Sequence, residues 1–275
     1  MSEGLAAVVL AGGLSLRFGS NKLLHKVGDE TMLGRVWRVV SETVDSVYLS
    51  VRSAKQASIL GRVCGVKPAN VIIDDKSLGC SGPVAGILST ALKAGTRYLL
   101  TIPADMPFIE KQPLKRFIEI YLSSNTRAAA ILDREGVPTT LLQLHETSWI
   151  LDNGLKLSRI KFRTPRASDL LRFAPSLLLV GAGLITEKLG TLKNVNTPQD
   201  LESMEEIGGL PRKLLRLACG WRGWRGVLHF HDGMYGRAAQ AFLLEGEYYR
   251  SLGLGLLAAH SNLDAWISWM ISANL

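Results

Sequence analysis

Residues 5–22 read Leu-Ala-Ala-Val-Val-Leu-Ala-Gly-Gly-Leu-Ser-Leu-Arg-Phe-Gly-Ser-Asn-Lys. An apolar run typical of a buried strand is followed at once by Gly12 and Gly13, and then by the cations Arg17 and Lys22. Glycines let backbone N–H groups approach anionic oxygens, and the two cations supply the opposite charge. The stretch therefore predicts a strand that ends in a phosphate-binding loop.

This loop fits neither of two common phosphate-binding templates. A P-loop ends in Gly-Lys-Ser/Thr, whereas Ser20 and Asn21 separate Gly19 from Lys22. A dinucleotide fingerprint needs Gly-x-Gly-x-x-Gly, which two adjacent glycines do not supply. A glycine-rich turn without a ligand would explain the glycines alone, but the two cations favour an anion site.

The first 205 residues alternate short apolar runs with helical patterns, which predicts βα units and a mostly parallel, mixed sheet. Strands are expected at residues 5–10, 46–51, 70–73, 98–102 and 192–196, with a hairpin or edge pair at 128–132 and 139–144. Helices are expected at 31–44, 54–63, 83–94, 113–123 and 168–173.

The sequence pattern changes near residue 206, where the alternation of apolar runs and helical patterns ends. Helical patterns follow at 210–218, 235–257 and 261–271, and this segment holds four of the six tryptophans. We expect an α/β domain over residues 1–205 and an all-helical C-terminal module of unknown role over residues 206–275.

Composition narrows the function classes. The chain has 275 residues, of which 47% are hydrophobic, and a formal net charge of +8 that fits an anionic ligand or partner. Its basic residues are spread along the chain, which makes nucleic acid an unlikely partner. Three well-separated cysteines favour a reduced, intracellular protein without a structural zinc site. The N-terminus lacks a signal peptide and the apolar run 176–185 is too short to span a bilayer, so we expect a cytoplasmic protein.

Three polar residues follow predicted strands or open predicted helices. Asp105 follows the strand at 98–102, where a carboxylate can hold Mg²⁺, although capping of a turn explains it equally well. Asp75 precedes the small residues at 82–86, which permit close approach of a base or ribose, but helix punctuation is the better local explanation. Asn196 is an oxygen donor at a helix start, and capping by Thr197 suffices there.

The basic residues at 211–226 are interleaved with tryptophans and lack acids. Such a stretch contacts nucleic acid or an acidic partner, or forms a basic helix face whose tryptophans pack on the main domain. The latter is at least as consistent with the sequence.

Taken together, four blocks resemble the molybdenum cofactor guanylyltransferase family. They are residues 10–22, Asp75 ahead of 82–87, residues 105–108 and residues 194–201. The resemblance covers residues 4–205. It implies a Rossmann-like nucleotidyltransferase domain that uses Mg²⁺ to join GTP to molybdopterin and releases pyrophosphate.

The resemblance also implies roles for individual residues. GTP would be bound by the residues of the first block and by two aspartates, namely Leu10, Ala11, Gly12, Gly13, Lys22, Asp75 and Asp105. Arg17, Lys22 and Asp105 would be catalytic. Asp105 would hold Mg²⁺, with Asn196 as a second ligand.

Several positions depart from the family pattern. Asn21 replaces an acidic residue, Phe18 stands where methionine is frequent, and Ser50-Val51-Arg52 lacks the asparagine that relatives place near the nucleoside. Alternatives are therefore a related transferase that uses CTP or another phosphorylated acceptor, such as a sugar phosphate or phospho-acid, and a non-catalytic nucleotide-binding regulator. A molybdoenzyme or a cofactor-carrier protein is a further possible partner, whereas no membrane is implied.

Overall fold

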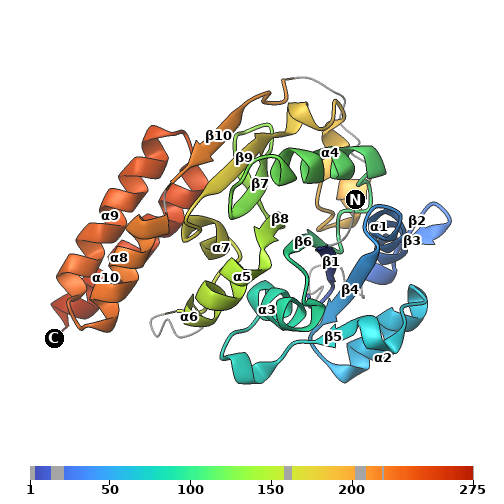
Figure 1. The fold of residues 1–275 in the computed structure, drawn as a ribbon, viewed down its shortest axis with the longest axis horizontal. Coiled ribbons are helices and arrows are strands. Elements are labelled where there is room, and N and C mark those ends of the chain that lie inside the picture. The colour runs from blue at the N-terminus through green and yellow to red at the C-terminus, as the bar shows by residue number, and fades with distance from the viewer. Residues whose placement is uncertain (1–3, 14–21, 158–162, 202–208, 219, 275) are drawn as a thin grey trace.

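A computed structural model describes residues 4–13, 22–157, 163–201, 209–218 and 220–274, and the statements below concern these residues. Their centre is an eight-stranded sheet (Figure 1). In sheet order its strands are β10 (Leu214–Leu217), β9 (Leu177–Gly181), β7 (Ala128–Leu132), β8 (Pro138–Glu146), β6 (Tyr98–Pro103), β1 (Leu5–Leu10), β4 (Ser46–Val51) and β5 (Val71–Ile73). A separate two-stranded ribbon joins β2 (Lys26–Val27) to β3 (Glu30–Thr31).

The sheet is mostly parallel, as predicted. Strands β5, β4, β1 and β6 pair in parallel, and β9 pairs in parallel with β7. The predicted hairpin is confirmed, because β7 and β8 pair antiparallel. Strand β8 also runs antiparallel to β6, and β10 runs antiparallel to β9. The sheet therefore places the ends of β1, β4 and β6 side by side at one edge.

Helices cover both faces of the sheet. One hydrophobic core packs α1 (Met32–Ser41), α2 (Ala54–Val63) and α4 (Lys111–Leu122) against the sheet. The second core lies on the other face and contains residues of α3 (Pro83–Ala94), α5 (Thr147–Trp149), α6 (Leu155–Leu157) and α7 (Asp169–Arg172). Side chains of Thr31 and Ser53 cap α1 and α2 by accepting backbone N–H groups, and Pro83 occupies the first turn of α3.

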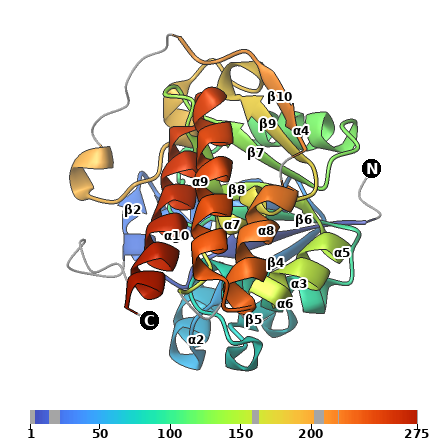
Figure 2. The same cartoon turned by 90° about the vertical axis from the view of Figure 1, so that its left-hand side faces the viewer.

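The C-terminal region ends in three helices, α8 (Gly220–His231), α9 (Tyr235–Ser251) and α10 (Gly255–Ala273). They lie side by side at one end of the molecule, with α9 between the other two (Figure 2). No helix in the described ranges combines the length and the apolar character that crossing a membrane would require.

Buried charges join these helices to the sheet domain. Arg172 of α7 is fully buried and donates to Glu245 of α9 and Asp264 of α10, at 2.5 and 2.8 Å. Arg163 donates to Asp264 and to Asp169 of α7. Burial alone would raise the pKa of Asp169, but the charges of the two arginines hold it below its ordinary value.

Three expectations for secondary structure are wrong. The break between the last two helices lies at residues 252–254 instead of 258–260, because α10 already begins at Gly255. Residues 210–218 were expected to be helical, but Leu214–Leu217 form the edge strand β10, because β9 offers it a free row of backbone hydrogen-bonding groups. Residues 192–196 do not form a strand. Instead, the N–H of Val195 donates to the carbonyl of Asp105 at 2.8 Å. The predicted domain boundary at residue 205 lies outside the described residues.

Candidate active site

The candidate site lies where β1, β4 and β6 end. Backbone hydrogen bonds continue past these ends, since the N–H of Ala11 donates to Ser50 and the N–H of Ala104 donates to Leu10. The chain therefore stays in register until Gly12 and Asp105 have been placed next to the sheet edge. The carboxyl ends of parallel strands are the usual ligand sites of open α/β sheets.

Lys22, Asp105 and Asn196 come together at this edge. Lys22 begins a short 3₁₀ helix, η2 (Lys22–Leu24), and its Nζ lies 2.6 Å from Asp105 Oδ2. The same Nζ donates to the carbonyl of Val195 at 3.1 Å and to Asn196 Oδ1 at 3.4 Å. Asp105 and Asn196 stand 83 and 174 positions from Lys22 in sequence, so the fold alone unites them.

The turn after Asn196 holds that residue in place. The carboxylate of Asp200, in the 3₁₀ helix η8 (Pro198–Leu201), accepts the backbone N–H groups of Asn196 and Thr197 at 2.7 and 2.8 Å. These two donors keep the pKa of Asp200 below its usual range. The turn therefore has two roles. It satisfies the backbone N–H groups of Asn196 and Thr197, and it places the side chain of Asn196 next to Lys22.

Only one of the two carboxylate oxygens of Asp105 has a hydrogen-bond partner among the described residues. Oδ2 accepts Lys22, whereas Oδ1 is buried and has no hydrogen-bond partner among the described residues. A buried carboxylate oxygen without a partner is costly, so it fits a ligand that supplies positive charge. The described part of the chain contains no group of three or more His, Cys, Asp or Glu that could hold a metal. Asp105 Oδ1 and Asn196 Oδ1 are oxygen donors of the kind that Mg²⁺ takes, since this ion commonly binds one or two protein oxygens and completes its shell with phosphate oxygens and water.

Asp74, which was missed from the sequence, lies closer to the glycine loop than Asp75. Asp74 Oδ1 accepts the hydroxyl of Ser50 at 3.1 Å, and Oδ2 lies 3.7 Å from where a Cβ on Gly12 would stand. Burial raises the pKa of Asp74. Asp75 is exposed and its carboxylate accepts the N–H of Ser77, which caps the 3₁₀ helix η4 (Lys76–Leu78). Asp74 is the first residue after β5, which is a position comparable to that of Asp105 after β6.

Glycines around the site serve two purposes. A Cβ on Gly86 would stand 2.2 Å from Ser50 Oγ, so this glycine lets α3 approach β4 closely. Gly82 precedes α3 with φ of +67°, a conformation that favours glycine. By contrast, a Cβ on Gly13 would meet no described atom within 4 Å. Packing within the described structure thus explains Gly86 but leaves Gly13 available for a ligand to approach. Arg17 lies outside the described residues, as do Phe18 and Asn21.

A family model and curated relatives both match this chain to nucleotidyltransferases. A family model described as MobA-like NTP transferase domain matches residues 7–161. The molybdenum cofactor guanylyltransferase of Sinorhizobium fredii is 32% identical over 212 residues, which span 73% of this chain and 90% of that protein. The molybdenum cofactor guanylyltransferase of Rhodopseudomonas palustris is 28% identical over 220 residues, or 73% of this chain and 91% of that protein.

A solved structure shares the fold. Molybdopterin-guanine dinucleotide biosynthesis protein A from Archaeoglobus fulgidus superposes with a TM-score of 0.60 at 21% identity, over 73% of this chain and 96% of the other. In each of these comparisons, about a quarter of this chain has no counterpart.

Proposed function

Because the chain belongs to the MobA-like NTP transferase family, we propose that it transfers the guanylyl group of GTP to molybdopterin or the molybdenum cofactor and releases pyrophosphate. The supporting observation is the joint placement of Lys22, Asp105 and Asn196 at the sheet edge. A protein that only bound nucleotide would not need a lysine and a half-satisfied carboxylate in contact.

The reaction exchanges one phosphate bond for another. A terminal phosphate oxygen of the pterin forms a bond to the α-phosphorus of GTP, and the bond from that phosphorus to the bridging oxygen of the β-phosphate breaks. Pyrophosphate leaves with the bonding electron pair. The protein supplies position and opposite charge rather than a nucleophile of its own.

Each site residue contributes to that task. Lys22 carries the positive charge that neutralises the triphosphate, assisted by Arg17. Backbone groups of Leu10, Ala11, Gly12 and Gly13 line the approach of the nucleotide, and Asp75 contacts the nucleoside. Asp74 is a second acid at the same end of the sheet and is a further candidate for that contact. Mg²⁺, held by Asp105 and Asn196, would supply additional charge neutralisation on the phosphate oxygens.

A pyrophosphate-release assay tests the proposal. GTP and CTP are supplied in turn, each with and without molybdopterin, in the presence of Mg²⁺. We expect release with GTP only when the pterin is present. Release with CTP instead would support the cytidylyl alternative suggested by Ser50-Val51-Arg52. Release with neither nucleotide would contradict transfer and favour a nucleotide-binding regulator.

The surroundings of the enzyme are part of the same proposal. We place it in the cytoplasm, where GTP is available, and infer that a molybdoenzyme or a cofactor-carrier protein receives its product.

A further inference from the structure

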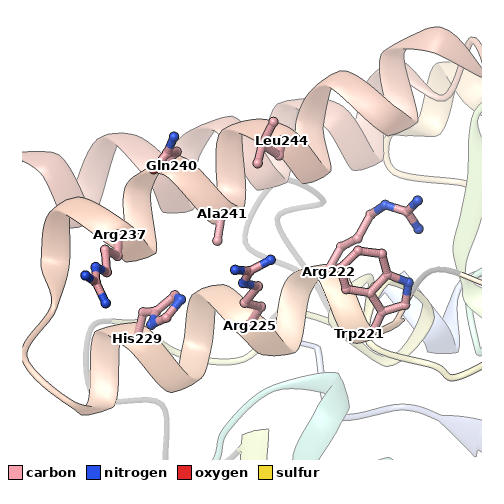
Figure 3. Close-up of a pocket in the computed structure, with 8 residues that line it drawn as sticks. All are labelled: Trp221, Arg222, Arg225, His229, Arg237, Gln240, Ala241 and Leu244. Carbon is pink, nitrogen blue, oxygen red and sulfur yellow. The ribbon is translucent and has the colours of Figure 1, made fainter.

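A second concave site lies in the C-terminal region, in a groove between α8 and α9 (Figure 3). The groove has a volume of about 330 Å³ and shares no residue with the candidate active site. Helix α8 contributes Trp221, Arg222, Arg225 and His229, and helix α9 contributes Arg237, Gln240, Ala241 and Leu244. This volume is in the range of pockets that bind small molecules.

Glycines give the groove its shape. Gly223 and Gly226 lie on the buried side of α8, where Cβ atoms would stand 2.2 Å from the ring of Phe173 and 2.5 Å from that of Phe242. Their absence of side chains brings α8 close to its neighbours. Arg222, Arg225 and His229 project from the neighbouring face of α8, where they line the groove together with residues of α9.

The lining is cationic and lacks acids. Arg222, Arg225 and His229 follow one another at intervals of three and four residues, so they are neighbours on one helix face. The guanidinium groups of Arg222 and Arg225 are like charges at a spacing where they repel. Within the described ranges no ion pair offsets that repulsion for Arg222, Arg225 or Arg237. This arrangement is suited to a counter-charge from outside the chain.

The arginines differ in how far they are already engaged. Arg222 is held between the rings of Trp221 and Tyr248, at 4.5 and 3.9 Å from their centroids, and donates to the carbonyl of Ala218. Arg237 contacts Met234 Sδ at 3.7 Å, which is a weak acceptor. Arg225 makes no hydrogen bond to another described residue, and Figure 3 shows its guanidinium in the groove, between the helices. Two guanidinium groups are therefore available to bind phosphate oxygens.

One end of the groove is apolar and exposed. Trp221 is 58% exposed and Leu244 is 56% exposed, although large apolar side chains are usually covered. An exposed indole beside guanidinium groups suits a flat ring that carries phosphates, because the ring can lie against the apolar end while arginines hold the anionic end.

We propose that the α8–α9 groove is a second binding site, distinct from the transferase site, for a nucleotide-class ligand with a flat ring and two or more phosphates. The groove is too small to hold a folded partner. Its arginines, Arg222 and Arg225 on α8 and Arg237 on α9, match a chain of phosphates better than a single carboxylate.

Isothermal titration of the full chain with GTP and with inorganic tripolyphosphate tests this site. We expect two GTP equivalents for the unmodified chain and one for the Arg225→Gln/Arg237→Gln variant, whose groove affinity should fall at least about tenfold. Arg250→Gln removes an exposed arginine of α9 outside the groove and should retain two. A Lys22→Met variant should still bind the one equivalent of GTP that occupies the groove. Circular dichroism melting verifies that each variant is folded.

The nucleotide class is tested by a second comparison. The groove should bind GTP more tightly than tripolyphosphate, and Trp221→Ala should bring the two affinities together. Four results would each overturn the inference. Two concern GTP alone: a single equivalent in the unmodified chain, or an unchanged groove affinity in the double arginine variant. The other two are equal affinity of the unmodified groove for GTP and tripolyphosphate, and stronger binding of a short poly-glutamate peptide. Pyrophosphate release reports on the transferase proposal separately, since it does not depend on how many equivalents bind.

Discussion

The Lys22–Asp105 pair and the ion network around Arg172 contain the same chemical groups in different surroundings. Lys22 and Asp105 keep 14% and 21% of their side chains exposed, and one carboxylate oxygen has no partner among the described residues. Arg172, Asp169, Glu245 and Asp264 are fully buried, and each takes part in at least one ion pair.

The difference distinguishes a ligand-binding site from a structural contact, here called the joint, which is the ion network of Arg172, Asp169, Glu245 and Asp264. Burying an ion pair costs desolvation energy that is recovered only when all the charges are well paired, so a complete network is suited to fixing two parts of a chain together. An incomplete, partly exposed pair can exchange partners at lower cost. Completeness of pairing therefore distinguishes the charges that a ligand would use from those that hold the helices in place.

The largest expected effect is on the incomplete pair. Asp105→Ala should lower nucleotidyl transfer by about 10³-fold or more, because both the proposed metal ligand and the partner of Lys22 are lost. The melting temperature should change little, since the side chain is partly exposed. Asp29→Ala, at an exposed aspartate in the β2–β3 turn, is the matched control. Retention of the unmodified rate of pyrophosphate release by Asp105→Ala would contradict the metal assignment.

The second effect is on the complete network. Arg172→Met should lower the free energy of unfolding by about 3–5 kcal/mol, because three buried carboxylates lose a shared partner. Urea denaturation measures this loss. Transfer per folded molecule should remain close to that of the unmodified chain. A loss below about 1 kcal/mol would show that the network is not a structural joint.

Glycines offer a third comparison between the two regions. Gly223→Ala should lower the free energy of unfolding by about 1–2 kcal/mol, because crowding against Phe173 outweighs the better helix propensity of alanine. Gly13→Ala should leave unfolding almost unchanged but weaken GTP binding, since its Cβ would project into open space. Thermal melts and equilibrium binding of GTP measure the two effects. The reverse pattern would place the ligand elsewhere.

The smallest effect is a pH dependence. The folded pKa of Asp169 lies below its value in the unfolded chain, which is about 3.9. Its contribution to stability is thus complete above about pH 4 and is lost as the pH falls through the folded pKa. A measurement just below pH 4 therefore detects only the beginning of this loss of stability. Asp169→Asn should be less stable at neutral pH and should flatten the acid limb of a plot of melting temperature against pH; an unchanged limb would contradict this role.

Much of the sheet domain is predictable because its elements have strong local patterns. The ranges 46–51, 54–63 and 83–94 have the predicted bounds in the structure, since apolar periodicity and proline position define them. Strand β10 was missed because Leu-Leu-Arg-Leu carries no alternation, and its conformation depends on the edge of β9.

The site was predictable in part. Asp105 stands just after β6 and Lys22 closes the loop that begins where β1 ends, so both could be expected near the carboxyl ends of parallel strands. Asp74 was missed because two adjacent aspartates project in different directions, which a one-dimensional pattern does not reveal. The ion network could not be foreseen at all, because Arg163 and Asp264 stand 101 positions apart.

That separation also has a consequence for how the chain is made. Arg163 and Arg172 are synthesised well before Asp264, and at about 5–20 residues per second the ribosome needs on the order of 5–20 s to add the residues between. During that interval Asp264 cannot neutralise either arginine, whereas Asp169, which pairs with both, is already in the chain. The network around Arg172 can therefore be completed only after α10 has been made, and a chain that stops before α10 would lack Asp264 together with Leu257 and Ala258 of the second core.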